Sequence, residues 1–188
     1  MEEKLDNKQS LEIISTMIAE AKHSISRSGS FYILLWGWVI SLANFAHYTL
    51  EKMDYDYPFI VWVITIPTAI VNAVYSVREA RKAKVKVYLD KVYGQIWVAI
   101  GIAIIIALVF MGQLDMHHNP VIMLLAGVGM YVTGILLKFN PVKIGAFVLW
   151  AGAIIGFLLP VVDQFLVAGI SIFLGYLIPG YMLKRIEK

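Results

Sequence analysis

Long apolar stretches alternate with short polar segments along the whole chain. A transmembrane helix needs about 20 mostly apolar residues to cross a hydrocarbon core roughly 30 Å thick, and the sequence holds six stretches of that kind. The pattern therefore predicts an all-α, polytopic membrane protein. We expect its spans near residues 31–50, 58–77, 93–112, 120–137, 142–160 and 164–182.

The composition supports this class. Hydrophobic residues make up 60% of the chain and charged residues 15%, with a mean hydropathy of +0.74, whereas soluble domains hold about 45–50% apolar and 25% charged residues. The connections between the stretches are too short for a soluble domain. We expect one membrane domain at 31–188, preceded by a tail at 1–30. The first apolar stretch is too long for a signal-peptide core, so it should be retained.

Charge predicts the orientation of the spans. Of the 16 lysines and arginines, all except Lys52 lie in the tail, in the connections after the second and fourth spans, and at the C-terminus. Short basic loops stay in the cytoplasm. Both termini are therefore expected to be cytoplasmic.

The tail carries a helical pattern of its own between residues 10 and 28. Its apolar positions recur at intervals of three and four: Leu11, Ile14, Ile18, Ala21 and Ile25. This spacing predicts an amphipathic helix on the cytoplasmic side. Its apolar face would lie in the membrane interface, pack beneath the bundle or pair with a copy of itself, and the sequence leaves these three placements open.

A basic loop follows the second predicted span. Its main charges are Arg78, Arg81, Lys82, Lys84 and Lys86. Beside a membrane each basic residue attracts anionic headgroups by about 1 kcal/mol. The topology already requires such a loop, so we expect anionic lipid and not nucleic acid as its partner. The sequence leaves open whether the chain also binds a cytoplasmic protein and whether it forms a homo-oligomer.

Polar residues form matching stripes on the first two spans. Gly37, Ser41, Asn44 and His47 share one helix face, and Trp62, Thr65, Thr68 and Asn72 show the mirrored spacing. In a tight hairpin that turns near residues 54 and 55, two residues at equal depth have numbers that sum to 109. The pairs Gly37–Asn72, Ser41–Thr68, Asn44–Thr65 and His47–Trp62 all have this sum. We therefore expect Ser41, Asn44, His47, Thr65, Thr68 and Asn72 to form either interhelical contacts or a polar site.

Single residues refine this picture. Pro67 removes a backbone hydrogen bond and is expected to kink the second span, with Thr65 and Thr68 repairing the freed carbonyls. His117 and His118 are expected to be solvated loop residues, and one histidine without partners is a poor metal site. Gly152 and Gly156 have the small-xxx-small spacing of close helix contacts, which we expect within the monomer.

Catalysis and ion coupling have little support. No span carries an acidic or basic residue near its middle, where coupled transporters place them. Hydrolase, nucleotide-binding and zinc-protease motifs do not occur. We therefore expect a protein that is not an enzyme and has no cofactor.

The two ends of the chain resemble a family. The opening SLEIISTMIAEAK followed by SFYILLWGW, and the ending GYLIPGYMLKR, are similar to small six-span bacterial membrane proteins with no assigned activity. The resemblance implies six spans and a bacterial inner-membrane location. It implies no functional residues.

Two functions fit the sequence. In the first, the cytoplasmic helix and the basic loop bind lipid or a protein, as in a scaffold or regulator, while the membrane bundle anchors them. In the second, the polar residues of the first two spans line a small-solute transporter or channel.

Overall fold

The computed structural model describes the backbone of residues 7–82 and 88–187, and the side chains of residues 29–81 and 91–187. Within these ranges every element is a helix. In chain order they are α1 (Asn7–Lys52), the 3-10 helix η1 (Pro58–Ile64), α2 (Thr65–Lys82), α3 (Tyr88–Val109), α4 (His118–Leu136), α5 (Asn140–Phe157), α6 (Val161–Ile172), the π-helix η2 (Phe173–Leu177) and α7 (Ile178–Ile186).

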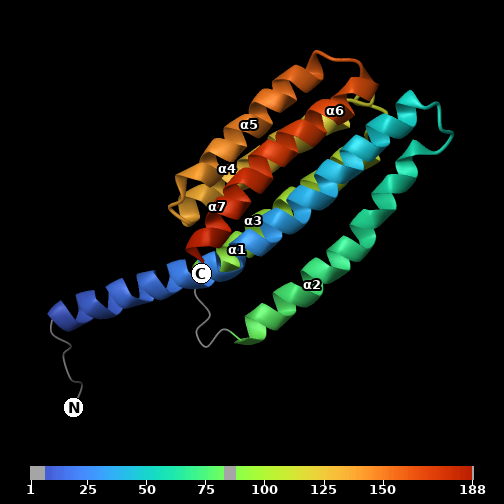
Figure 1. Cartoon of the computed structure of the whole chain (residues 1–188). Helices are drawn as coiled ribbons and strands as arrows, with labels where there is room; N and C mark the ends of the chain where they lie inside the picture. The colour runs from blue at the N-terminus through green and yellow to red at the C-terminus, as the bar shows by residue number, and fades with distance from the viewer. Residues whose placement is uncertain (1–6, 83–87, 188) are drawn as a thin grey trace.

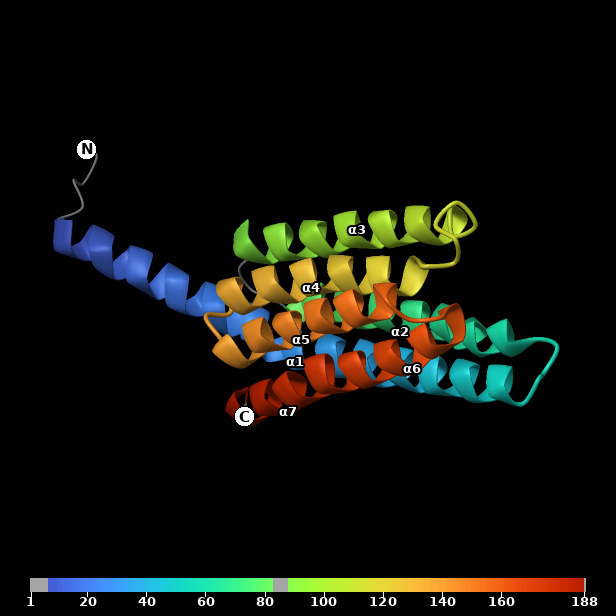
Figure 2. The same cartoon turned by 90° about the horizontal axis from the view of Figure 1, so that it is seen from above.

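Six helical segments are long and apolar enough to cross a membrane. They are Gly29–Lys52, Pro58–Arg81, Lys91–Val109, His118–Leu136, Asn140–Phe157 and Val161–Ile186. The prediction of an all-α chain with six spans is therefore confirmed. The spans lie side by side as a bundle (Figures 1 and 2). We call the end of the bundle where α7 ends the near end, and the end that holds Lys52 and Asp163 the far end.

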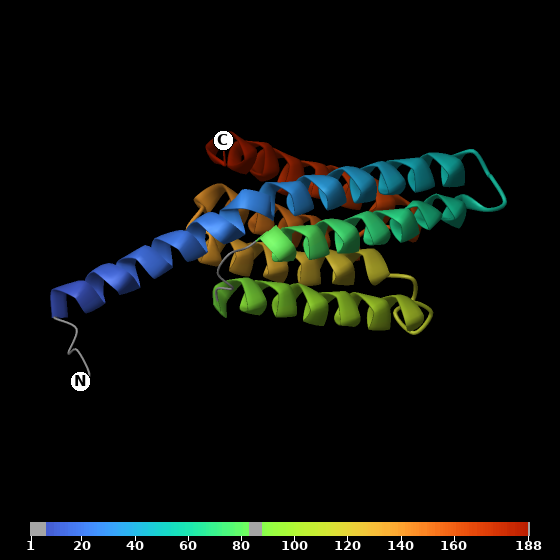
Figure 3. The same cartoon turned by 90° about the horizontal axis from the view of Figure 1, so that it is seen from below.

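The first helix does not end where the tail was expected to end. α1 runs without interruption from Asn7 to Lys52, because the one glycine at the expected boundary, Gly29, costs a helix only about 1 kcal/mol. The part of α1 before Gly29, residues 7–28, extends past the near end of the bundle (Figures 1 and 3). We call it the arm. Its side chains lie outside the described ones, so its amphipathic face stays a prediction.

Span one packs along span six over its whole length. Phe45 lies against Gly169, Gly37 against Tyr176 and Leu177, and Leu34 against Gly180. Each glycine lets the two helices approach where a side chain would collide, since a Cβ atom at Gly37 would lie 2.8 Å from both Tyr176 and Leu177. In each pair the two residue numbers sum to 213 or 214. A constant sum is expected when two antiparallel helices lie against each other without a change of register.

Spans two and three lie at the edge of the bundle. Only 6% of span two and 11% of span three are buried, against 50% of spans four and six. Most of the side chains that they expose are apolar, which suits contact with lipid tails. The bundle interior is therefore built mainly from spans one, four, five and six.

Span two changes helix type before its proline. The 3-10 helix η1 ends at Ile64, and Pro67 lies in the first turn of α2. Proline is tolerated in the first turn of a helix, and the kink expected at Pro67 stays a prediction. The hydroxyls of Thr65 and Thr68 donate to the carbonyls of Trp62 and Ile64 at this junction, whereas the carbonyl that a proline at position 67 frees, four residues earlier, is that of Val63.

The apolar core fills the near part of the bundle. Its main cluster includes Ile33, Met130, Val142, Leu149 and Tyr176, each at most 7% exposed. A second cluster of only Met123, Ala153 and Ala168 lies nearer the far end. The far end is thus left with a smaller apolar core.

Candidate functional site

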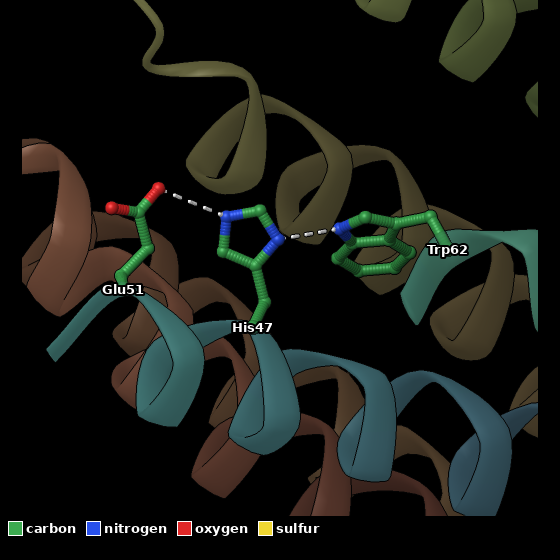
Figure 4. Close-up of polar contacts among 3 residues, drawn as sticks. All are labelled: His47, Glu51 and Trp62. Carbon is green, nitrogen blue, oxygen red and sulfur yellow. Dashed lines mark hydrogen bonds and ion pairs between the residues drawn. The ribbon is translucent and has the colours of Figure 1, made fainter. Parts of the chain in front are cut away.

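Three polar groups form a chain at the far end of span one. His47 Nδ1 accepts a hydrogen bond of 3.0 Å from Trp62 Nε1, and its Nε2 lies 3.5 Å from Glu51 Oε1 (Figure 4). Trp62 can only donate, so a neutral His47 carries its proton on Nε2, toward Glu51. The expected pairing of His47 with Trp62 is present, and it joins α1 to η1.

Phe165 of α6 lies between two histidines. The His47 ring stacks on it at a centroid distance of 3.8 Å, and the His118 ring meets its edge at 6.1 Å. His118 is 8% exposed and Asn119 is 5% exposed. The expectation that His118 is a solvated loop residue is therefore wrong, because α4 already begins at His118 and its first turn is buried.

Ser41 and Asn44 are almost fully buried, at 0% and 1% exposure. The Asn44 amide nitrogen donates to the carbonyl of Ile40 on its own helix, at 2.9 Å. The Asn44 amide oxygen and the Ser41 hydroxyl have no hydrogen-bond partner. The stripe also contains Gly37, which lies against span six, so this face of α1 does not meet span two alone.

The partner stripe on span two makes fewer cross-helix contacts than expected. Thr65 and Thr68 donate to carbonyls of their own span, a common way for a hydroxyl in a helix to satisfy itself. Asn72 does reach span one, where its Oδ1 accepts from Trp36 Nε1 at 3.1 Å. The hairpin register is therefore close to the expected one, but the level-by-level match between all the polar groups is not present.

Sequence reasoning missed Gln164. It lies in the first turn of α6 and is 0% exposed. Its amide nitrogen donates to the carbonyl of Leu159 at 3.2 Å, and its amide oxygen has no partner. The signal was present in the sequence, since a glutamine four residues after Pro160 opens an otherwise apolar stretch.

The remaining predicted residues lie outside this group of polar side chains. A Cβ atom at Gly152 would lie 2.0 Å from the Ser171 hydroxyl, and one at Gly156 would lie 3.0 Å from Pro120, so both glycines face other helices of the same chain. Arg78 and Arg81 are exposed. The side chain of Lys82 and the whole of Lys84 and Lys86 lie outside the described residues.

The interior of the far end therefore carries uncharged hydrogen-bonding groups from three helices. Among the described residues, no group of three or more His, Cys, Asp or Glu side chains could hold a metal ion. Amides, a hydroxyl and an imidazole both donate and accept hydrogen bonds, which suits a neutral polar molecule. No protein-family model, curated protein or solved structure matches the chain.

Proposed function

We propose that the chain is a non-enzymatic, multi-pass protein of the bacterial inner membrane, with both termini in the cytoplasm. The arm of α1 binds a cytoplasmic protein, and the basic residues around it bind anionic lipid headgroups. The six-span bundle anchors both. The protein acts as a scaffold or regulator in this proposal.

The observation that carries the proposal is the direction of the arm. An amphipathic helix that rests on a membrane lies in the plane of the interface, across the end of a bundle. The arm instead continues outward beyond the near end, although it is bent relative to span one (Figures 1 and 3). At about 1.5 Å per residue, its 22 residues from Asn7 to Ser28 reach roughly 33 Å, which favours a partner away from the lipid surface.

The base of the arm is held by the end of the chain. The backbone N–H of Ser30 donates to Glu187 Oε1 at 2.9 Å, and the Ser30 hydroxyl donates to Glu187 Oε2. Hydrogen bonds to a carboxylate are stronger than those between neutral groups. A partner that binds the arm or pulls on it therefore acts on span six as well as on span one.

Charge at the near end supports the orientation and the lipid contact. Arg78 and Arg81 at the end of α2, and Lys184 and Arg185 at the end of α7, are exposed. The far end has the acidic residues Asp54, Asp56, Asp115 and Asp163 and one lysine, Lys52. This asymmetry is the one expected when the near end faces the cytoplasm.

Site-specific photo-crosslinking in growing bacteria tests the arm. A photoreactive amino acid at Ile14 or Ile18, on the predicted apolar stripe, should give one protein adduct of defined mass. The matched control is Thr16, on the opposite face of the same turns, which should give none. Equal adducts from both faces, or adducts to lipid alone, would contradict a protein partner.

A solute pathway between spans one and two has weaker support. Thr65 and Thr68, which would line it, already donate to their own backbone. The unpartnered polar atoms of span one belong instead to the face of α1 that also carries Gly37, which packs on span six.

A further inference from the structure

Five buried side chains, between the middle of span one and the far end, each hold a polar atom without a partner. They are Ser41 Oγ and Asn44 Oδ1 on α1, His118 Nδ1 and Asn119 Nδ2 on α4, and Gln164 Oε1 on α6. We call them the polar cluster. Each of the five residues is at least nine-tenths buried, the most exposed being His118 at 8%.

An unpartnered buried polar atom is unfavourable, and most such atoms in proteins are satisfied by protein groups or by ordered water. All five belong to spans one, four and six, which are 39%, 50% and 50% buried. His47, one turn after Asn44, and His118 of α4 lie against the same ring, Phe165, which follows Gln164 in α6. This shared contact brings the three helices together at the level of the cluster.

The chemistry of the cluster defines its occupant. Two amide oxygens accept hydrogen bonds, the Asn119 amide nitrogen donates, and the Ser41 hydroxyl and the His118 ring nitrogen can do either. The cluster contains no carboxylate, lysine or arginine. Such a set suits a neutral molecule that both donates and accepts, and carries no formal charge that would balance an ion.

We infer that spans one, four and six enclose a site for a small, neutral hydrogen-bonding molecule, either water or a short polyol. At the far surface the Lys52–Asp163 ion pair, 3.2 Å long and half-exposed, bridges α1 and α6. This inference does not depend on the arm or its partner.

The chain has no cysteine, so single-cysteine variants test the site without background. Ser41→Cys and Gln164→Cys place a thiol in the cluster, while Ala43→Cys and Ala168→Cys place one at buried apolar positions on the same two helices. Only the thiolate reacts with methyl methanethiosulfonate, and a thiolate forms where water or polar groups solvate it. The two cluster thiols should react at least about tenfold faster than the two controls.

The reaction is measured on purified protein in micelles, with melting temperature and gel filtration confirming that each variant is folded. Slow reaction at all four positions would overturn the inference, because the cluster would then be dry. Fast reaction at all four would overturn it too, since the rate would then report a loose bundle.

Glycerol distinguishes the two occupants. If a polyol binds, glycerol should slow the labelling of Gln164→Cys and leave any residual reaction of Ala168→Cys unchanged. Fast labelling that glycerol does not alter assigns water to the site. Unequal rates at Ser41→Cys and Gln164→Cys, with one as slow as its control, would overturn a site shared by the three helices.

Discussion

The two ends of the bundle interior differ in how they are filled. The near part holds the main apolar cluster around Leu149, and backbones there touch, as at Gly145 and Gly175. The far end holds His47, His118 and Gln164, with polar atoms that the chain itself leaves unpartnered. Close packing gives a fixed structure, whereas each unpartnered buried polar atom costs about 1–3 kcal/mol unless something binds it. The comparison points to the near part as the main source of stability, and the far end is where we propose that a small molecule binds.

The largest expected effect comes from the near core. Leu149→Ala removes a side chain that is 0% exposed and should lower the free energy of unfolding by about 3 kcal/mol, from lost contacts and the cavity left behind. Denaturant unfolding in micelles measures it. The control is Ile154→Ala on the same helix, which is 63% exposed and should change little. Equal losses of unfolding free energy in the two variants would contradict the view that the near core provides most of the stability.

The second effect tests the contact between backbones. A Cβ atom at Gly145 would lie 2.1 Å from the carbonyl oxygen of Gly175, so Gly145→Ala must separate α5 from η2. We expect a loss of about 2 kcal/mol in the free energy of unfolding, seen as a lower melting temperature. Gly101→Ala in α3 has open space around its Cβ and should be neutral or slightly stabilising. A neutral Gly145→Ala would show that the near part is not tightly packed.

A smaller effect is expected at the far end. Trp62→Phe replaces the indole with a smaller aromatic ring that lacks the donor to His47 Nδ1, and should lower the free energy of unfolding by about 1 kcal/mol. Trp38→Phe, which removes an exposed hydrogen bond to Tyr181, is the matched control and should have less effect. If Trp62→Phe were as damaging as Leu149→Ala, the far end would carry stability too.

The smallest effect is expected at the far surface. Lys52→Gln breaks the ion pair with Asp163, whose side chains are 51% and 37% exposed. Exposed pairs are worth little, so we expect a loss of about 0.3 kcal/mol that shrinks further in concentrated salt. Thermal unfolding at low and high salt measures it. A loss above about 1 kcal/mol would mean that this ion pair stabilises the bundle more than an exposed pair normally does.

The spans could be predicted from the sequence because each depends only on a local run of apolar residues. The contact between spans one and two could also be predicted, because a short turn fixes the register of a hairpin. The hydrogen bonds Trp62–His47 and Trp36–Asn72 lie close to the expected register. Both features are local in the chain.

The long contact between span one and span six could not be predicted in the same way. It joins residues more than 100 positions apart, such as Phe45 and Gly169, and hydropathy says nothing about which spans are neighbours. The role of His118, Asn119 and Gln164 was missed for a related reason. They lie in the first turns of spans, where polar residues normally face water, and only the packing of the helices shows that they are buried.

The pairing of span one with span six also sets an order of events during synthesis. Chains are made from the N-terminus, so Ser41, Asn44 and His47 enter the bilayer long before the ribosome has produced Gln164 and Phe165. Until then these polar side chains have no finished interior to enter. A nascent chain of this protein therefore needs the translocon or an insertase to shelter its first span, and one that stops before residue 161 leaves that span without its main partner.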